Sequence, residues 1–121
     1  MSAITFLDEV EATGASSIKA LPFLVAKHTV QVTTTGEPTA VTVDLEGSLD
    51  GVTFFVLSSH AFSGAEITAE AAMFHVVDKP VNFVRLDLTT LTGGTDPTVT
   101  ALYDGDSVPE AIRATGRRGT F

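Results

Sequence analysis

The chain has 121 residues and no cysteine, which is enough for one compact domain with a real core and excludes a disulfide framework, a thiol nucleophile or a zinc–thiolate site. The net charge of −8 argues against direct binding of nucleic acid, which needs lysine and arginine to replace counterions. No apolar run approaches the roughly 20 residues of a membrane helix, and the opening MSAITFLDEVEA has early acids and no basic stretch, so we expect neither a membrane span nor a signal peptide.

The charge is unevenly distributed along the chain. Residues 1–112 hold four basic and fifteen acidic residues, a net charge of −11, whereas residues 113–121 hold three arginines and no acid, a net charge of +3. This basic end has two interpretations: a solvated terminus, or an arm that docks on an acidic surface of a neighbouring subunit.

Alternation and turn signals predict short strands along most of the chain. Residues rich in threonine and valine alternate between apolar and polar with period two, and glycine, proline and aspartate punctuate them. We expect strands at Ile4–Val10, Ser17–Leu21, Lys27–Thr35, Thr39–Glu46, Thr53–Ser58, Met73–Val77, Val81–Thr90 and Thr98–Tyr103.

The central hairpin, Thr39–Leu57, organises the rest. Its first strand should have one buried face and one solvent-exposed face, and residues 47–51 should form the turn. Its second strand is apolar on both faces and should be covered on both. Of the adjacent Phe54 and Phe55, one should belong to the core, and the other should meet the second sheet or mark an assembly surface.

Two segments lack a clear strand pattern. Residues 66–72 contain helix formers, but we favour a strand and a turn there. Beyond residue 104 the composition shifts to glycine and proline without periodicity. We therefore divide the chain into an N-terminal arm or edge strand (1–16), a β-sandwich domain (17–104) and an extended basic C-terminal tail (105–121).

About eight short strands separated by turns predict an all-β, antiparallel sandwich, and a jelly roll is one way to connect them. Strand order stays open at this point.

Reaction chemistry is not evident in the sequence. His28, His60 and His75 show no spacing typical of a metal site, and no cofactor is expected. Asp44 and Glu46 should lie on a solvated face, with Asp50 in the turn. We therefore do not expect an enzyme. Tyr103 is the only tyrosine and there is no tryptophan, which weakens a sugar-stacking site.

Several local patterns resemble a group of small structural proteins of tailed bacteriophages. These patterns are an E-G-S-L-D-G turn, an aromatic residue just beyond it, an F-V-R-L strand, a glycine-rich loop and a P-T-V-T strand. They fall on Glu46–Gly51, Phe54, Phe83–Leu86, Gly93–Gly94 and Pro97–Thr100, within roughly residues 13–105. Similar turns occur in discoidin-like and sugar-binding sandwiches, which often have tryptophan at the position of Phe54.

The resemblance implies a β-sandwich that decorates or cements a capsid. We therefore expect a subunit on the outer capsid surface of a virion, assembled in the host cytoplasm, that binds the major capsid protein and itself as a dimer or trimer. A receptor- or glycan-binding module of a head or tail fibre is the alternative. Alternation places Phe55 and Phe83 on faces away from the core, and the C-terminal tail supplies charged and aromatic side chains. The expected interface residues are therefore Phe55, Phe83, Arg113, Arg117, Arg118 and Phe121.

Overall fold

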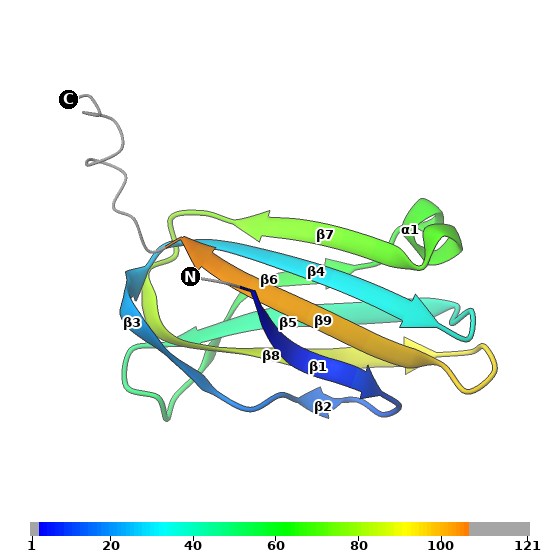
Figure 1. Cartoon of the computed structure of the whole chain (residues 1–121), viewed down its shortest axis with the longest axis horizontal. Coiled ribbons are helices and arrows are strands. Elements are labelled where there is room, and N and C mark those ends of the chain that lie inside the picture. The colour runs from blue at the N-terminus through cyan, green and yellow to red at the C-terminus, as the bar shows by residue number, and fades with distance from the viewer. Residues whose placement is uncertain (1–2, 107–121) are drawn as a thin grey trace.

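A computed structural model describes residues 3–106, which form two antiparallel sheets packed face to face (Figure 1). The described elements, in chain order, are β1 (Ile4–Val10), β2 (Gly14–Ala15), β3 (Lys19–Val25), β4 (Lys27–Thr35), β5 (Ala40–Ser48), β6 (Phe55–Ala61), α1 (Gly64–Ala69), β7 (Ala71–Val76), β8 (Val81–Thr92) and β9 (Thr98–Asp106). The predicted antiparallel β-sandwich is confirmed.

One sheet has the order β1-β9-β4-β7 and the other β2-β8-β5-β6, with β3 also paired to β8. Most connections cross from one sheet to the other, and the exceptions are the step from β2 to β3 and the hairpin of β5 and β6. The first and last strands pair, and β4, β5, β8 and β9 occupy the sheet interiors. This is the strand order of a jelly roll.

The core lies between the two inner faces, where the alternation placed it. Val43, Leu45, Val84, Leu86 and Leu88 are all fully buried. Val43 pairs with Leu88, and Leu45 with Leu86, so the two strands present one continuous apolar face. Period two over Val81–Thr90 predicts that Val84, Leu86 and Leu88 face the core, and this prediction is confirmed.

The expectation for the second strand of the central hairpin was wrong. β6 lies at the edge of its sheet, bound to β5 alone, and is not covered on both faces. Phe55 is 66% exposed, and Phe54 is half-buried and outside the buried core. An apolar run of this length does not distinguish a central strand from an uncovered edge strand.

A helix replaces the strand and turn expected over residues 66–72. In α1, the Ser63 hydroxyl accepts from the Glu66 amide, and the Glu66 carboxylate accepts from the Ser63 amide. This reciprocal capping box stabilises a single short helix, which ends at Glu70 in the left-handed conformation. The Ser-x-x-Glu spacing was the signal that could have predicted it.

The strand expected at Ser17–Leu21 is longer than predicted. β3 continues through Pro22 to Val25, and its pairing with β8 is irregular between Ala20 and Val25. Proline removes one donor but is tolerated at a sheet edge where the ladder is already broken. The segment after Pro22 therefore stays in the sandwich as an irregular edge strand.

His28 is buried in this core and forms two hydrogen bonds. The Tyr103 hydroxyl donates to its Nδ1 at 2.7 Å, and its Nε2 donates to the Lys79 carbonyl at 3.0 Å. This tautomer satisfies both ring nitrogens of a neutral imidazole. Burial lowers the pKa of His28 below its ordinary 6.5, although the Lys79 carbonyl opposes the shift.

The buried histidine makes the stability of the protein depend on pH. Above about pH 6.5 the imidazole is neutral in both states, and its contribution is fully present. As the pH falls below that value, the unfolded chain takes up a proton that the folded chain resists. We expect the free energy of unfolding to decrease by at most about 1.4 kcal/mol per pH unit from this group.

Urea denaturation between pH 7.5 and 5 measures this decrease. His28→Gln should be less stable at neutral pH but should lose much of the pH slope. The matched control is His75→Gln, because His75 lies in β7 with an exposed side chain that bonds the Thr29 hydroxyl. An unchanged slope in His28→Gln would contradict the assignment.

Candidate interaction surface

The two aromatic residues predicted at an interface lie on opposite faces of one sheet. Phe55 pairs with Gly47, which also pairs with buried Val84, so Phe55 points to the inner side of the sheet. Phe83 is the neighbour of Val84 and points outward, where it is half-buried beside Gly51. The expectation of a face away from the core is therefore confirmed for Phe83 and was wrong for Phe55, and the structure does not bring the two residues together. The other predicted interface residues, Arg113, Arg117, Arg118 and Phe121, lie outside the described residues.

The turn between β5 and β6 is tightly bonded. Asp50 Oδ1 accepts from the Ser48 hydroxyl and from the amides of Val52 and Thr53, at 2.8–2.9 Å. The Ser48 hydroxyl oxygen in turn accepts from the amides of Asp50 and Gly51. The Thr53 and Val52 amides, followed by the Ser48 hydroxyl, lower the pKa of Asp50 to about 2. Asp50 thus has the predicted turn role.

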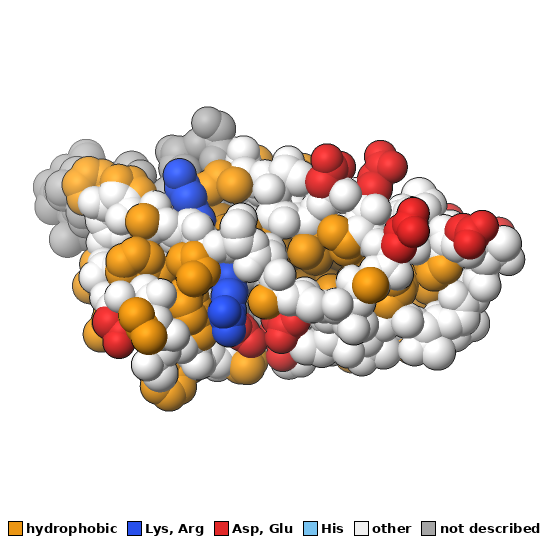
Figure 2. All heavy atoms as spheres, turned by 90° about the horizontal axis from the view of Figure 1, so that it is seen from below, with side chains coloured by type: hydrophobic (Ala, Val, Ile, Leu, Met, Phe, Trp, Pro, Cys, Tyr) orange, Lys and Arg blue, Asp and Glu red, His pale blue; other side chains and the backbone are white. Residues whose placement is uncertain are grey.

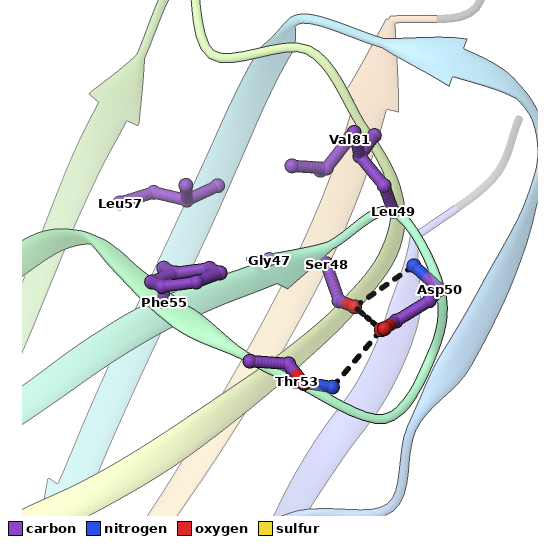
Figure 3. A pocket seen from close by; sticks show the side chains of 8 residues that line it. All are labelled: Gly47, Ser48, Leu49, Asp50, Thr53, Phe55, Leu57 and Val81. Carbon is purple, nitrogen blue, oxygen red and sulfur yellow. Dashed lines mark hydrogen bonds between the residues drawn. The ribbon is translucent and has the colours of Figure 1, made fainter.

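An apolar groove of about 260 Å³ lies beside this turn (Figure 3). Leu49, Phe55, Leu57 and Val81 supply its apolar walls. Gly47 lets two of these walls pack directly on the backbone: a Cβ at residue 47 would lie 2.7 Å from Val81 Cγ1 and 2.8 Å from Leu57 Cδ1. Gly47, Ser48, Asp50 and Thr53 complete the lining.

The groove belongs to a larger apolar end of the sandwich. Exposed apolar side chains gather at this end (Figure 2), where β3 and β7 finish and β6 begins (Figure 1). We define the apolar end by its members, all more than half exposed: Phe23, Leu24, Leu49, Val52, Phe55, Val56 and Val77. An exposed patch of this kind marks an interaction surface more often than a free surface.

The opposite end of the sandwich is acidic. Figure 2 shows acidic side chains at the end away from the apolar cluster. The connecting segments there, residues 8–15, 35–39, 62–70 and 93–97, contain acids and no lysine or arginine. Those whose side chains are exposed are Asp8, Glu9, Glu11, Glu37 and Asp96. The sandwich is therefore polarised along its length, apolar at one end and anionic at the other.

Residues of the phage-like patterns contact one another on the outer face of the larger sheet. Arg85 Nε donates to Glu46 Oε1 at 2.6 Å, and its guanidinium carbon lies 4.3 Å from the centre of the Phe54 ring. The Gly51 Cα carries no side chain and has φ +78°, and a Cβ there would lie 3.1 Å from the Phe83 ring. These residues hold the turn against the sheet.

The expectation of a solvated face for Glu46 was wrong. Glu46 is only 8% exposed, and Asp44 lies directly opposite Asp87 on the paired strand. Burial, followed by the charges of Glu46 and Asp44, raises the pKa of Asp87 above its ordinary value. The period-two pattern correctly places Asp44 and Glu46 on the outer face of β5. It does not show which neighbouring strand covers that face.

The three histidines occupy separate environments. His28 is in the core, His75 lies on β7, and His60 stacks on Phe74 while its Nε2 lies 3.0 Å from Glu66 Oε1. Among residues 3–106, no three potential ligands are grouped as a metal ion would need. No described helix is long and apolar enough to cross a membrane.

Three further aromatic and apolar residues bear on a binding surface. Tyr103 is fully buried beneath Phe6 and His28, so it is not the exposed ring that a stacked sugar needs. The apolar run Phe23–Val25 predicts cover for an open end of the core, but Phe23 and Leu24 are about 60% exposed and sequence reasoning missed them as surface residues. Two large apolar residues directly after Pro22 were the available signal.

Comparison with known proteins supports the β-sandwich fold but assigns the chain to no family. The sequence matches no protein-family model and no curated protein. The solved structures similar to this chain include the SPBc2 prophage-derived protein YomS, with a TM-score of 0.55 and 11% identity over 84% of this chain and 90% of YomS. PirA is similar with a TM-score of 0.50 and 14% identity over 84% of this chain and 91% of PirA.

The third similar structure is a family 89 glycoside hydrolase from Clostridium perfringens, with a TM-score of 0.52 and 12% identity. That match covers 89% of this chain but only 15% of the hydrolase, so the likeness is to one part of a much larger enzyme. At these identities, the three similarities show that the chain is a β-sandwich of a shape found in several different proteins.

Proposed function

We propose that this protein is a structural subunit of a tailed-phage particle that decorates the outer surface of the capsid and binds the major capsid protein. The observation that carries the proposal is the apolar end: seven large apolar side chains more than half exposed on a body otherwise closed around one core. A decoration subunit needs a rigid fold and a surface for its lattice partner, and it needs no reaction chemistry.

Two further observations support this function. The phage-like patterns of the turn and the F-V-R-L strand contact each other beside this surface, where Arg85 binds Glu46 and covers the Phe54 ring. The similar fold of YomS, whose name describes it as prophage-derived, agrees with a phage origin. We further propose that the subunit is a dimer or trimer without enzymatic activity and that it binds neither nucleic acid nor membrane.

The test is binding of the purified protein to capsids assembled without it. Phe23→Ser removes an aromatic ring that is 62% exposed at the apolar end. If this ring is a central contact, its loss should weaken binding by about thirtyfold, the effect of a hot spot of about 2 kcal/mol. Met73→Ser is the matched control, because Met73 is 51% exposed on the outer face of the other sheet.

Occupancy of the capsid is measured by sedimentation, and capsid stability by thermal melting with and without added protein. Equal binding by Phe23→Ser and Met73→Ser would overturn the role of the apolar end. Absence of binding by the unaltered protein would overturn the decoration function. A glycan array distinguishes the alternative module, and reproducible binding lost on replacing Phe55, the exposed ring nearest the polar turn, would favour it.

A further inference from the structure

We propose that the groove between β6 and β8 is the docking site of this chain's own C-terminal segment, residues 107–121. The inference concerns the groove walls, Leu49, Phe55, Leu57 and Val81, and does not depend on binding to a capsid.

The shape of the groove fits an apolar peptide side chain. At about 260 Å³ it is smaller than the roughly 300 Å³ at which small-molecule pockets begin. Phe55 and Leu49 stand on opposite sides of it, 66% and 65% exposed, so much apolar surface remains for an occupant to cover (Figure 3). The only charged residue of its lining, Asp50, lies at the turn and carries a carboxylate that stays ionised above about pH 2.

The composition of residues 107–121 complements both features. The segment, SVPEAIRATGRRGTF, places Val108, Ile112 and Phe121 among polar residues, so single apolar side chains can enter a small groove. Its three arginines and one glutamate give a side-chain charge of +2, whereas residues 1–106 carry four bases and fourteen acids, a charge of −10. An aromatic or aliphatic anchor flanked by arginine suits an apolar groove with an aspartate beside it.

The position of the last described strand makes the groove reachable. β9 ends at Asp106, which pairs with Lys27 at the start of β4, and this is the same end of the sandwich as the start of β6 (Figure 1). Fifteen further residues span up to about 50 Å when extended. That length allows the segment to reach the groove of its own copy or that of a neighbouring copy.

Disulfide trapping in the full chain tests the docking, because the natural sequence has no cysteine. Thr53→Cys places a thiol at the groove, and Thr120→Cys places one beside Phe121. Under mild oxidation, we expect this pair to form a disulfide at least about tenfold faster than the control pair Thr95→Cys and Thr120→Cys, because docking raises the effective thiol concentration. Thr95 is exposed at the opposite end of the sandwich.

A non-reducing gel reports whether the bridge lies within one copy or joins two copies, and both results support the proposal. Adding Phe55→Ser, or Leu49→Ser if the first variant fails to fold, should reduce the yield of the groove pair to that of the control pair. An excess of a synthetic peptide of residues 107–121 should do the same. Equal rates for the two pairs, or a rate that Phe55→Ser does not change, would overturn the inference. This assay contains no capsid. The docking proposal can therefore fail while the decoration function holds, and the decoration function can fail while the docking proposal holds.

Discussion

Replacing Arg85 with methionine is expected to reduce the free energy of unfolding by about 2–3 kcal/mol, one of the largest effects of a surface substitution in this protein. The physical reason is the Glu46 carboxylate, which is 8% exposed and accepts from Arg85 Nε at 2.6 Å. Removing one partner of a fully buried ion pair costs about 3–5 kcal/mol, and the 30% exposure of the Arg85 side chain reduces that figure.

The Glu46 carboxylate and the Phe54 ring both require an arginine at position 85 for full stability. Arg85 also covers the Phe54 ring, with its guanidinium carbon 4.3 Å from the ring centre. Arg85→Lys keeps the charge but loses the planar group that stacks on the ring and bonds the carboxylate, so we expect an intermediate loss. The like charges of Asp44 and Asp87, paired across β5 and β8, remain beside Glu46 in either variant.

The loss should depend on pH in a defined direction. Arg85 lowers the pKa of Asp87, against the larger effects of burial and of Glu46 and Asp44, which raise it. Without Arg85, the folded state holds the ionised Asp87 less well, so the stability difference between the variant and the natural protein should be largest at neutral pH. As the pH falls toward the ordinary aspartate pKa of 3.8, which lies below the raised pKa of Asp87, part of the loss should be recovered.

Urea denaturation of the single variants and of Glu46→Gln with Arg85→Met measures the coupling between the two side chains. The double variant should be more stable than the sum of the single losses predicts, because it leaves no unpaired carboxylate at position 46. A change of less than about 0.5 kcal/mol in Arg85→Met would place Arg85 among ordinary surface residues.

The sequence was sufficient to predict the sandwich because its strands follow period two. Inward residues such as Val43, Val84 and Leu86 are where alternation put them, and all three are fully buried. Alternation describes one strand at a time, however. It does not say that β6 would be an edge strand while β8, equally apolar, would lie inside the sheet. That difference depends on long-range pairing.

The same limit explains the candidate surface. Phe55 points to the inner side of the sheet but lies outside the core, because β6 is an edge strand, and the packing beside it depends on Gly47 facing Val81 and Leu57, residues 34 and 10 positions further along the chain. Likewise, Asp44 and Glu46, expected on a solvated face, lie in a partly buried cluster because β8 places Asp87 and Arg85 beside them. Alternation placed Asp44 and Glu46 on the correct face of their strand. Their partners on β8 were not predictable, because local spacing carries no information about which strands pair.

The glycine-rich loop shows this most clearly, and it gives the second large prediction. Residues 93–97 connect β8 to β9 and pack against the connection from β4 to β5, where the Thr95 amide donates to the Gly36 carbonyl at 2.8 Å. Each connection passes from one sheet to the other. The contact between them therefore ties both sheets together at the acidic end.

Gly94→Ala is expected to reduce the free energy of unfolding by about 3 kcal/mol or more, and Gly93→Ala by about 1–2 kcal/mol. Both glycines have φ +77°, so the backbone strain of an added Cβ is the same at the two positions. At Gly94 the Cβ would lie 2.3 Å from the Gly36 carbonyl oxygen and 2.8 Å from that of Glu37. At Gly93 the nearest atoms belong to the Thr39 side chain, which can shift at a lower cost than a backbone carbonyl even though its hydroxyl donates to the Thr92 carbonyl.

The difference between the two variants isolates the close contact of the two loops from the strain of positive φ. Urea denaturation at pH 7.5 gives both free energies, and amide exchange of Thr95 shows whether its bond to Gly36 is the contact that is lost. Gly64→Ala is a further control, because no atom lies within 4 Å of an added Cβ there. If Gly94→Ala were no less stable than Gly93→Ala, residues 93–97 could change conformation without losing their contact with Gly36. Residues 93–97 would then be a tolerant connection instead of the segment that joins the two sheets.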